Sequence, residues 1–506
     1  MTKPTRHILG SILNIPEPQT DLERQLLAEN EYLRKQVSEL TKRVAELEVL
    51  LAKALKNSST SSKPPSSDIV KPPKPPSNTA GGKRKRGGQP GHTRAMRSPF
   101  SEEEISEVRT YALQACPCCG GAVSLLPEAP QRVVQQVEVV PVHYRVEEHR
   151  GPLYYCPRCG KRHYAALPSS VEKGGLIGPV LTAQIAYMKG AMHASFSTIR
   201  KYVRDVMGLT LSRGHLSKLI GKTSDALENS YEALLALVKS EEVVNVDETG
   251  HKDNGDRFWT WCFRGAHHCV FRVADTRSSR ILLEVLGEEF RGVLGCDHFS
   301  AYKKYHRVCD VRIQFCLAHF IREIKFLTTL SNPDVVAYGE RLLGQFRSLF
   351  VALNHPELCH PADLNRVLED IRDAIVEQSQ QNVPPANEAQ LIAKRLRNYE
   401  TEYFEFIQTP GVEPTNNSAE QAIRFVTIDR HITQGTRSEK GQRWCERIWT
   451  ILATCSMQDK SAYDYLVQAV QAHFNGQPAP LLIPPPPDDI NSRQKTPLSR
   501  FTSLSN

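Results

Sequence analysis

The sequence predicts a multidomain protein: an N-terminal coiled coil, a zinc-binding region, a helical region of helix-turn-helix type, and an α/β domain interrupted by helices. Three observations lead to this fold class. Leucine recurs every seven residues near the N-terminus, two Cys-x2-Cys pairs follow, and short β-branched runs ending in acidic residues alternate with helical patterns. With 506 residues, the chain is also too long for a single domain.

Charge and cysteine content indicate where such a protein works. The formal net charge is +8, and residues 1–100 hold 18 Lys/Arg against 9 Asp/Glu, so the excess is N-terminal. This distribution favours a polyanionic partner such as nucleic acid. The odd number of cysteines, 13, favours a reducing, cytoplasmic location with metal-bound thiolates over a disulfide framework. No apolar run reaches 18 residues, so we expect no membrane span.

Residues 20–56 have the pattern of a coiled coil. Leucine occupies one core position of four successive heptads, and mostly Val or Leu occupies the other, with a single Asn: Leu26, Leu33, Leu40, Leu47, and Asn30, Val37, Val44, Leu51. β-Branched residues at a with Leu at d favour two parallel strands, and one polar a position fixes the register. We therefore expect a homodimer or higher oligomer; the alternative is a helix packed on its own domain.

Residues 57–97 form a linker rich in Pro, Ser and Gly, with too few apolar residues for a core. Ten Lys/Arg lie between Lys56 and Arg97, against a single Asp. The linker is therefore interpreted as a flexible tether that lies on phosphates. Its basic cluster, which could enter a narrow minor groove, is Lys83, Arg84, Lys85 and Arg86.

Residues 98–170 contain two Cys-x2-Cys pairs, each followed by Gly: Cys116 with Cys119, and Cys156 with Cys159. Four thiolates suit tetrahedral Zn²⁺, and four protein ligands leave no open position, so this zinc is expected to be structural. The 36 residues between the pairs exceed the usual ribbon spacing and alternate like strands. The alternative is buried, reduced cysteine.

Residues 171–240 are predicted to be helical and to include a helix-turn-helix. Ile199, Val203 and Val206 line one apolar face, Gly208 ends that helix, and Ser212 is a suitable N-cap for the next. The start of the second helix of this motif contacts bases, which makes the candidates Arg213, His215 and Lys218. An ordinary αα-hairpin would give the same pattern.

Residues 241–324 predict strands that end in aspartates. The β-branched run before Asp247 is followed by a hairpin around 265–268, a short helix, a second apolar strand ending in Asp297, and then a further strand and helix. Sites gather at strand ends in such sheets, so the two aspartates are expected to meet. Glu248 should point to the other face of its strand. His298 is a candidate to orient phosphate or water. For Cys316 and His319, we favour packing or DNA contact over half of a metal site.

A third carboxylate follows the helical segment 325–410. Residues 411–475 include an Asn pair, with Asn417 or Ser418 as a helix cap and Glu420 in the first turn; the alternative role for this Glu is a capping acid. Arg424, one turn later, is a candidate phosphate contact. Three carboxylates around one point suit two Mg²⁺ (or Mn²⁺) ions that act on a phosphodiester. The last segment, 476–506, is predicted to be a disordered tail.

Several ordered motifs together resemble the insertion-sequence-66 transposase family, of the TnpC type. They are SSKPPSSD (61–68), GGQPGH (87–92), the two CxxC pairs, VDET (246–249), GCDHFSAY (295–302), CLAHFIREI (316–324) and NNSAEQAIR (416–424). The resemblance spans about residues 20–470. The chain departs from the family pattern at Thr415, where Asp is usual, and at Leu317, where Trp is usual.

The resemblance implies a ribonuclease-H-like catalytic domain with an α-helical insertion and a DDE triad at Asp247, Asp297 and Glu420. It implies a bacterial, nucleoid-associated enzyme that cuts the ends of an insertion element and joins them to target DNA, with accessory element-encoded proteins as possible partners. Two alternatives stay open: a catalytically inactive DNA-binding regulator of transposase descent, and a nuclease of the same fold that does not join.

Overall fold

The computed structural model describes residues 20–54, 100–105, 107–110, 114–115, 117–122, 124, 135, 144–159, 161–360 and 362–483. The chain divides into two units: Met1–Pro72, His149–Lys201 and Thr210–Asn506 in one, and Pro73–Glu148 and Tyr202–Leu209 in the other. Within the described residues, no helix combines the length and the apolar character that crossing a bilayer requires.

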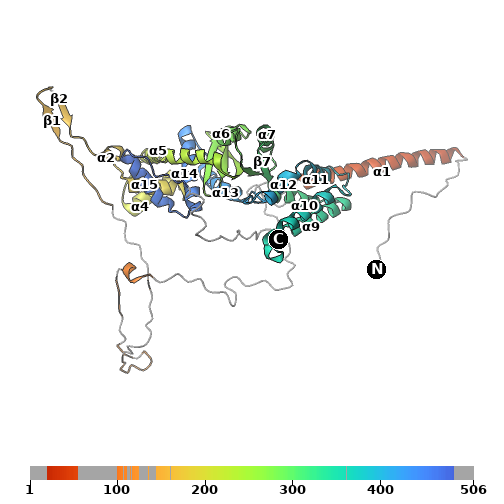
Figure 1. The fold of residues 1–506 in the computed structure, drawn as a ribbon, viewed down its shortest axis with the longest axis horizontal. Coiled ribbons are helices and arrows are strands. Elements are labelled where there is room, and N and C mark those ends of the chain that lie inside the picture. The colour runs from red at the N-terminus through yellow and green to blue at the C-terminus, as the bar shows by residue number, and fades with distance from the viewer. Residues whose placement is uncertain are drawn as a thin grey trace. The chain divides into compact units, whose positions relative to one another are not determined.

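A five-stranded mixed sheet lies at the centre of the larger unit (Figure 1). Its spatial order is β5-β4-β3-β6-β7. β3 (Val243–Asp253), β4 (Asp256–Arg264) and β5 (Cys269–Ala274) form an antiparallel meander, whereas β6 (Val293–Cys296) and β7 (Arg312–Phe315) run parallel to β3. The predicted hairpin at 265–268 is confirmed, since it joins β4 to β5. β3 is therefore the middle strand, flanked by one antiparallel and one parallel neighbour.

Turn chemistry explains the tight β3–β4 hairpin. Asn254 and Gly255 connect the strands, and both have positive φ, 51° and 99°. That conformation is required by the two-residue turns whose twist matches the flanking strands, and Asn-Gly adopts it at low cost. Close approach also fixes the parallel pair, because a Cβ on Gly295 of β6 would overlap the side chain of Asn245 on β3.

Helices make the connections that parallel strands require. α6 (Arg280–Leu286) lies between β5 and β6, and α7 (Ser300–Cys309) lies between β6 and β7. The sequence interpretation missed α7, whose apolar residues are few and whose buried side chains include Tyr302 and Tyr305. α8 (Leu317–Leu327) begins two residues after β7 ends, as the strand-to-helix pattern predicts.

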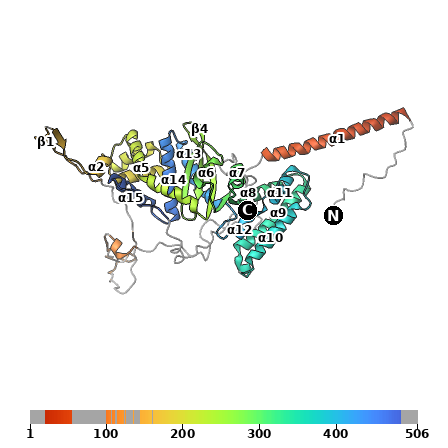
Figure 2. The same cartoon turned by 45° about the horizontal axis from the view of Figure 1, so that its top comes forward.

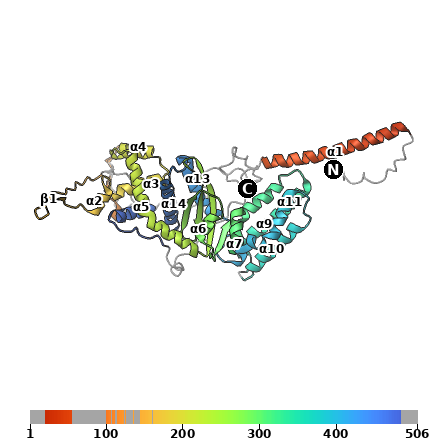
Figure 3. The same cartoon turned by 90° about the horizontal axis from the view of Figure 1, so that it is seen from above.

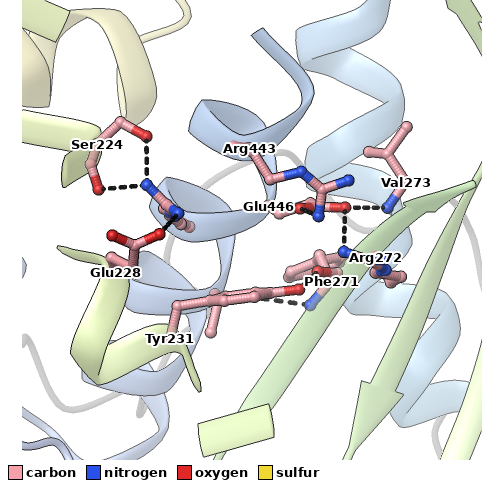
Figure 4. A network of polar contacts seen from close by, with 10 residues as sticks. Ser224, Glu228, Tyr231, Phe271, Arg272, Val273, Arg443 and Glu446 are labelled. Carbon is pink, nitrogen blue, oxygen red and sulfur yellow. Dashed lines mark hydrogen bonds and ion pairs between the residues drawn. The ribbon is translucent and has the colours of Figure 1, made fainter. Parts of the chain in front are cut away.

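One helix covers the outer edge of the sheet. α14 (Glu439–Met457) presents Glu446, Thr450 and Thr454, at i, i+4 and i+8, to the backbone of β5. Their oxygens accept from the N–H groups of Val273 (2.7 Å), Phe271 (3.0 Å) and Cys269 (3.2 Å) respectively. These are alternate residues of an edge strand, whose free donors would otherwise invite another chain. Figure 4 shows the Glu446 end of this contact.

The helices before the sheet pack with those after it. α5 (Arg213–Leu237) contacts β5, α14 and α15 (Ala462–Phe474), and α3 (Pro179–Gly190) contacts α5 and α15. α2 (Ser169–Gly174) also contacts α15. Tyr231 of α5 donates to the Phe271 carbonyl of β5 at 3.1 Å. α3 and α5, which belong to the predicted region 171–240, thus pack with the C-terminal helices. Figure 2 shows α5 beside α14 and α15.

The helix-turn-helix pattern is present in part. α4 (Phe196–Met207) is followed by Gly208 at φ 69° and by α5, whose N-cap Ser212 accepts from the His215 N–H at 3.1 Å. Ile199 and Val203 are fully buried. Val206, in contrast, is 52% exposed, so its assignment to the apolar face is wrong.

A group of helices separates β7 and α8 from α13 (Asn417–Thr433) in the chain (Figure 3). Its members are α9 (Pro333–Asn354), the 3-10 turn η4 (Pro356–Leu358), α10 (Leu364–Gln380), α11 (Asn387–Asn398) and α12 (Glu400–Gln408). α9 packs on α8, and α12 packs on β7. This group contains no strand among its described residues.

Two further elements are local. α1 (Asp21–Ala54) is a 34-residue helix whose heptad leucines and valines are exposed, for example Leu40 at 62%. β1 (Leu153–Cys156) and β2 (Lys161–Tyr164) form an antiparallel hairpin that carries the second cysteine pair. The 3-10 turns η2 (Glu102–Glu104) and η3 (Val238–Ser240) complete the described elements.

Candidate active site

Two aspartates reach one region from neighbouring parallel strands. Asp247 lies within β3, and Asp297 is the residue after β6. The register pairs Asn245 with Gly295, so each aspartate lies two residues beyond a paired position. Each carboxylate also accepts a backbone N–H: Asp247 from Glu248 at 2.9 Å, and Asp297 from Phe299 at 2.8 Å. The sheet therefore brings the two acids to the same level.

The third carboxylate comes from the start of α13. Its N-cap is Asn416, not Asn417 or Ser418 as the sequence suggested, and the Asn416 side chain caps no N–H of the helix. Its amide instead donates to the Val246 carbonyl at 2.8 Å, next to Asp247. This bond fixes the first turn of α13, and with it Glu420, against the middle strand.

The charges of the three carboxylates affect one another's pKa values. Burial raises the pKa of Asp247 well above its ordinary value, and the charges of Glu248, Glu420 and Asp297 raise it further. Burial likewise raises the pKa of Asp297 and of Glu420, although Arg322 and Arg424 act in the opposite direction on Glu420. Carboxylates that repel one another in a partly buried place are suited to a divalent cation, whose charge would relieve the repulsion.

Glu248 has a different environment from Asp247. Its side chain is 1% exposed and forms an ion pair with Arg277 at 2.6 Å, and it accepts from the Tyr302 hydroxyl. Arg277 also lies over the Phe299 ring, 3.9 Å from its centroid. The Glu248 carboxylate is therefore paired with the Arg277 guanidinium and the Tyr302 hydroxyl. Sequence reasoning did not predict these roles for Arg277 and Tyr302, because both depend on tertiary contacts.

Cys316 and His319 lie beside Glu420. Cys316 is the N-cap of α8, and its sulfur accepts from the Asn416 N–H at 3.2 Å. The His319 Nδ1 is 3.6 Å from a Glu420 carboxylate oxygen. Cys316, His319 and Glu420 could hold a metal ion together, because their ligand atoms all lie within 4.8 Å of one another. The sequence favoured packing or DNA contact for Cys316 and His319 over half of a metal site, and the fold adds Glu420 as a possible third ligand.

His298 lies among aromatic side chains. Its ring packs against Phe315, Tyr399 and Tyr403, with centroid distances of 4.9, 5.1 and 6.2 Å. Burial lowers the pKa of His298 to about 3, so the imidazole is neutral at pH 7. The structure thus shows His298 packed between the strand end and the aromatic side chains of Tyr399 and Tyr403.

The candidate DNA-binding residues are distributed over several elements. Arg213 and Lys218 are exposed in the first two turns of α5, and His215 is partly exposed. The Arg213 guanidinium donates to the Ser197 hydroxyl. Arg424 is exposed on α13, one turn after Glu420. The basic cluster Lys83, Arg84, Lys85 and Arg86 lies outside the described residues.

The second cysteine pair has the local geometry of a metal-binding knuckle. Cys156 ends β1 and Cys159 lies in the turn before β2. Hydrogen bonds from the Cys159 backbone and thiol lower the pKa of Cys156, which favours the thiolate that zinc binds. Cys118 and Cys119 are exposed free thiols, whereas Cys116 lies outside the described residues.

Comparison with known families decides where the chain belongs. The model of the transposase IS66 family matches residues 174–443, more than half of the sequence. This chain belongs to the IS66 transposase family. The match begins in α2 and runs through the sheet, all three carboxylates and into α14, so it includes the helices α3 and α5 as well.

Two further matches cover the N-terminal part of this IS66 family member. The zinc-finger binding domain of transposase IS66 matches residues 114–160, a range that contains both CxxC pairs. The chain thus carries the zinc-finger domain of its family, which supports a structural zinc. Residues 14–98, which include α1, match a family of unknown function.

Three relatives of the chain come from Sinorhizobium fredii, and their names state no function. The uncharacterized protein y4jD is 28% identical over 248 residues, which is 44% of this chain and 47% of that protein. The match thus spans about half the length of y4jD. The uncharacterized protein y4hP is 21% identical, over 72% of each chain, and y4qI is 25% identical over 78% of this chain and 77% of its own.

Proposed function

We propose that the protein is a DNA transposase that cleaves the terminal repeats of an insertion element and joins them to target DNA, with Mg²⁺ (or Mn²⁺) held by Asp247, Asp297 and Glu420. One observation carries the proposal. Two adjacent parallel strands and the start of one helix place three partly buried carboxylates close enough that their charges repel one another. Family membership supports the reaction class, and the sheet order supports a ribonuclease-H-like catalytic domain.

The residues present fit such a cation. Carboxylate oxygens are the ligands that Mg²⁺ prefers, and one Glu420 oxygen is buried without a hydrogen bond among the described residues. When bound, the metal supplies an activated water or 3′-hydroxyl and stabilises the leaving oxygen of the phosphodiester. Without a cation, burial and mutual repulsion favour the protonated carboxyls, and metal binding would act against this.

The chain's own residues position these groups and the DNA. The bond from Asn416 to β3 holds Glu420, and Arg322, 3.9 Å from the Glu420 carboxylate, restrains it from the side of α8. Arg424 is exposed one turn further and is suited to a phosphate. We propose that Arg213, His215 and Lys218 contact the element end, while the basic linker with Lys83, Arg84, Lys85 and Arg86 adds sequence-independent affinity.

Pairing of two ends requires more than one chain. We propose that the exposed heptads of α1 form a homodimer or higher oligomer through a coiled coil, which would bring two basic linkers together. Accessory element-encoded proteins are possible further partners. On this proposal the protein acts at the nucleoid in the cytoplasm. The structural zinc would hold the segment 98–170 folded through Cys116, Cys119, Cys156 and Cys159.

An end-joining assay separates this function from its two alternatives. The full chain is incubated with labelled element ends, target plasmid and Mg²⁺, and end binding, strand nicking and joining are scored separately. We expect all three activities. Binding without nicking would instead assign an inactive regulator, and nicking without joining, even with pre-cleaved ends, would assign a nuclease of the same fold.

A further inference from the structure

The side chains of Cys316, His319 and Glu420 form a compact group of possible metal ligands. Cys316 and His319 come from the N-terminus of α8, and Glu420 comes from the first turn of α13. Two bonds join these helix starts: the Leu317 N–H donates to the Pro414 carbonyl at 2.9 Å, and the Asn416 N–H donates to the Cys316 sulfur at 3.2 Å. The two helix starts are therefore held together by one backbone–backbone bond and by one bond to the Cys316 sulfur.

Two buried polar atoms of the cluster have no hydrogen-bond partner in the described part of the chain, although buried polar atoms usually have one. The Nδ1 of His319 and the Oε1 of Glu420 are both buried, and neither makes a hydrogen bond among the described residues. They face each other at 3.6 Å. Ligands of a tetrahedral zinc, at about 2.0–2.3 Å from the ion, lie roughly 3.3–3.8 Å apart. An ion between these atoms would satisfy both, whereas leaving them unpaired costs free energy.

The donor set selects a thiophilic cation. Burial and the charge of Arg322 lower the pKa of His319 to about 4, so its imidazole is neutral and free to bind a metal at pH 7. Burial raises the pKa of the Cys316 thiol to about 11, but the Asn416 N–H acts against this and would stabilise the thiolate that forms when a metal displaces the proton. One thiolate and one carboxylate balance a divalent charge. Sulfur and imidazole favour Zn²⁺ over Mg²⁺.

We propose that Cys316, His319 and Glu420 form a second zinc site, separate from the zinc finger, which shares Glu420 with the proposed Mg²⁺ site. Three protein ligands leave a fourth position open, as in zinc sites that exchange a ligand. Because one carboxylate serves both sites, zinc binding would draw Glu420 away from Mg²⁺ and reduce cleavage. This consequence rests on the proposed function; the zinc site itself does not.

Metal content tests the site without any activity. Purified full chain, loaded with Zn²⁺ and dialysed, is expected to hold two zinc ions per chain by elemental analysis. Cys316→Ser and His319→Gln should each lower the content to one, and Cys455→Ser, at a buried cysteine of α14, should leave it at two. Equal zinc content in the wild type, Cys316→Ser and His319→Gln would overturn the proposal.

Cobalt spectroscopy tests the site even if a variant loses zinc only because it misfolds. The full-length Cys156→Ser/Cys159→Ser variant removes two zinc-finger ligands but leaves Cys316 unchanged. Co²⁺ titration should give it a thiolate-to-metal charge-transfer band, which adding Cys316→Ser should remove. If the band is absent before Cys316 is changed, the site does not bind a thiophilic metal and the proposal is wrong.

Zinc inhibition tests the shared carboxylate. The ratio of cleavage with and without micromolar Zn²⁺, at fixed Mg²⁺, is measured within each variant. Loss of a ligand should raise the inhibiting Zn²⁺ concentration by roughly tenfold or more in Cys316→Ser. Equal inhibition of wild type and Cys316→Ser would refute the sharing of Glu420. If no variant cleaves DNA, the proposed function fails, while the metal-content and cobalt results still decide the zinc site.

Discussion

Buried acidic side chains in the described residues have two kinds of surroundings. Asp247 and Glu420 lie among other carboxylates, whose charges raise the pKa of Asp247. Glu446 lies among donors: Arg443 at 2.5 Å, Arg272 at 3.5 Å and the Val273 N–H at 2.7 Å (Figure 4). Neighbouring carboxylates add to the effect of burial at Asp247, whereas Arg272 and Arg443 oppose it at Glu446. This difference separates a site from a structural contact.

Stability should depend on the ionisation of Glu446. Burial raises the pKa of Glu446 from 4.5 to about 7 in the folded protein. The folded state therefore holds a proton that the unfolded state releases, so this contribution is full below pH 4.5 and is lost as pH rises to 7. The shift corresponds to about 3 kcal/mol in the free energy of unfolding. Glu446→Gln should remove this pH dependence.

Chemical denaturation at pH 4.5 and pH 7, followed by tryptophan fluorescence, measures this effect. Glu439→Gln, an exposed change on the same helix, is the control and should keep the wild-type pH dependence. If Glu446→Gln shows the same loss of stability between the two pH values as the wild type, the assignment to Glu446 is wrong.

Sequence reasoning proposed Asp247, Asp297 and Glu420 as site residues but did not predict the side chains around them. The aspartates follow β-branched runs, and a period of two is a local signal. The neighbours of Glu420 come from α8, about a hundred residues earlier, and become visible only when Pro414 and Asn416 bond to the start of α8. The sequence favoured packing or DNA contact for Cys316 because its third possible metal ligand, Glu420, is distant in sequence.

At the scale of elements, strands with strong local signals were predicted and short polar helices were not. β3, β4 and β5 alternate or carry β-branched and aromatic residues, and Asn254-Gly255 provides the turn. α7 was not predicted because its sequence is rich in Lys, His and Arg. Its existence follows from topology, since β6 and β7 are parallel and require a crossover.

α1 provides a prediction at the same scale. Its heptad residues are exposed in the single chain, Leu40 at 62% and Leu33 at 53%, which favours burial against a second copy. Leu33→Asp with Leu40→Asp should place charges in that seam and convert an oligomeric full chain into a monomer. Light scattering coupled to size exclusion measures the mass.

A matched change outside the seam is the control for α1. Lys42→Asp also adds an acidic residue to this helix, but two positions beyond Leu40, where no heptad contact is expected. It should leave the oligomer intact. A wild-type chain that is monomeric at tens of micromolar, where a four-heptad coiled coil should roughly associate, would contradict the role assigned to α1.

At the scale of the whole molecule, C-terminal helices pack against helices that precede the sheet. The division of the sequence into consecutive domains did not predict this. α14 and α15 close over α3 and α5, which precede the sheet, so these four helices pack together although they are distant in the sequence. Composition marks the linker and the zinc region, because these depend on local residue types. Composition could not show that α5 packs on the α/β domain, because this depends on contacts between distant residues. One example is the bond from the Arg447 guanidinium of α14 to the Ser224 carbonyl of α5, at 3.0 Å.

The central claim is that Asp247 and Asp297 act in DNA cleavage through their charge. The most direct measurement is the rate of strand cleavage of a labelled element end in Mg²⁺ by the full-length variants Asp247→Asn and Asp297→Asn, with Asp256→Asn, an exposed hairpin residue, as the control. We expect both site variants to lose cleavage by at least about a thousandfold while binding the end nearly as well as the wild type, and the control to cleave normally. Wild-type cleavage by either site variant would contradict the account.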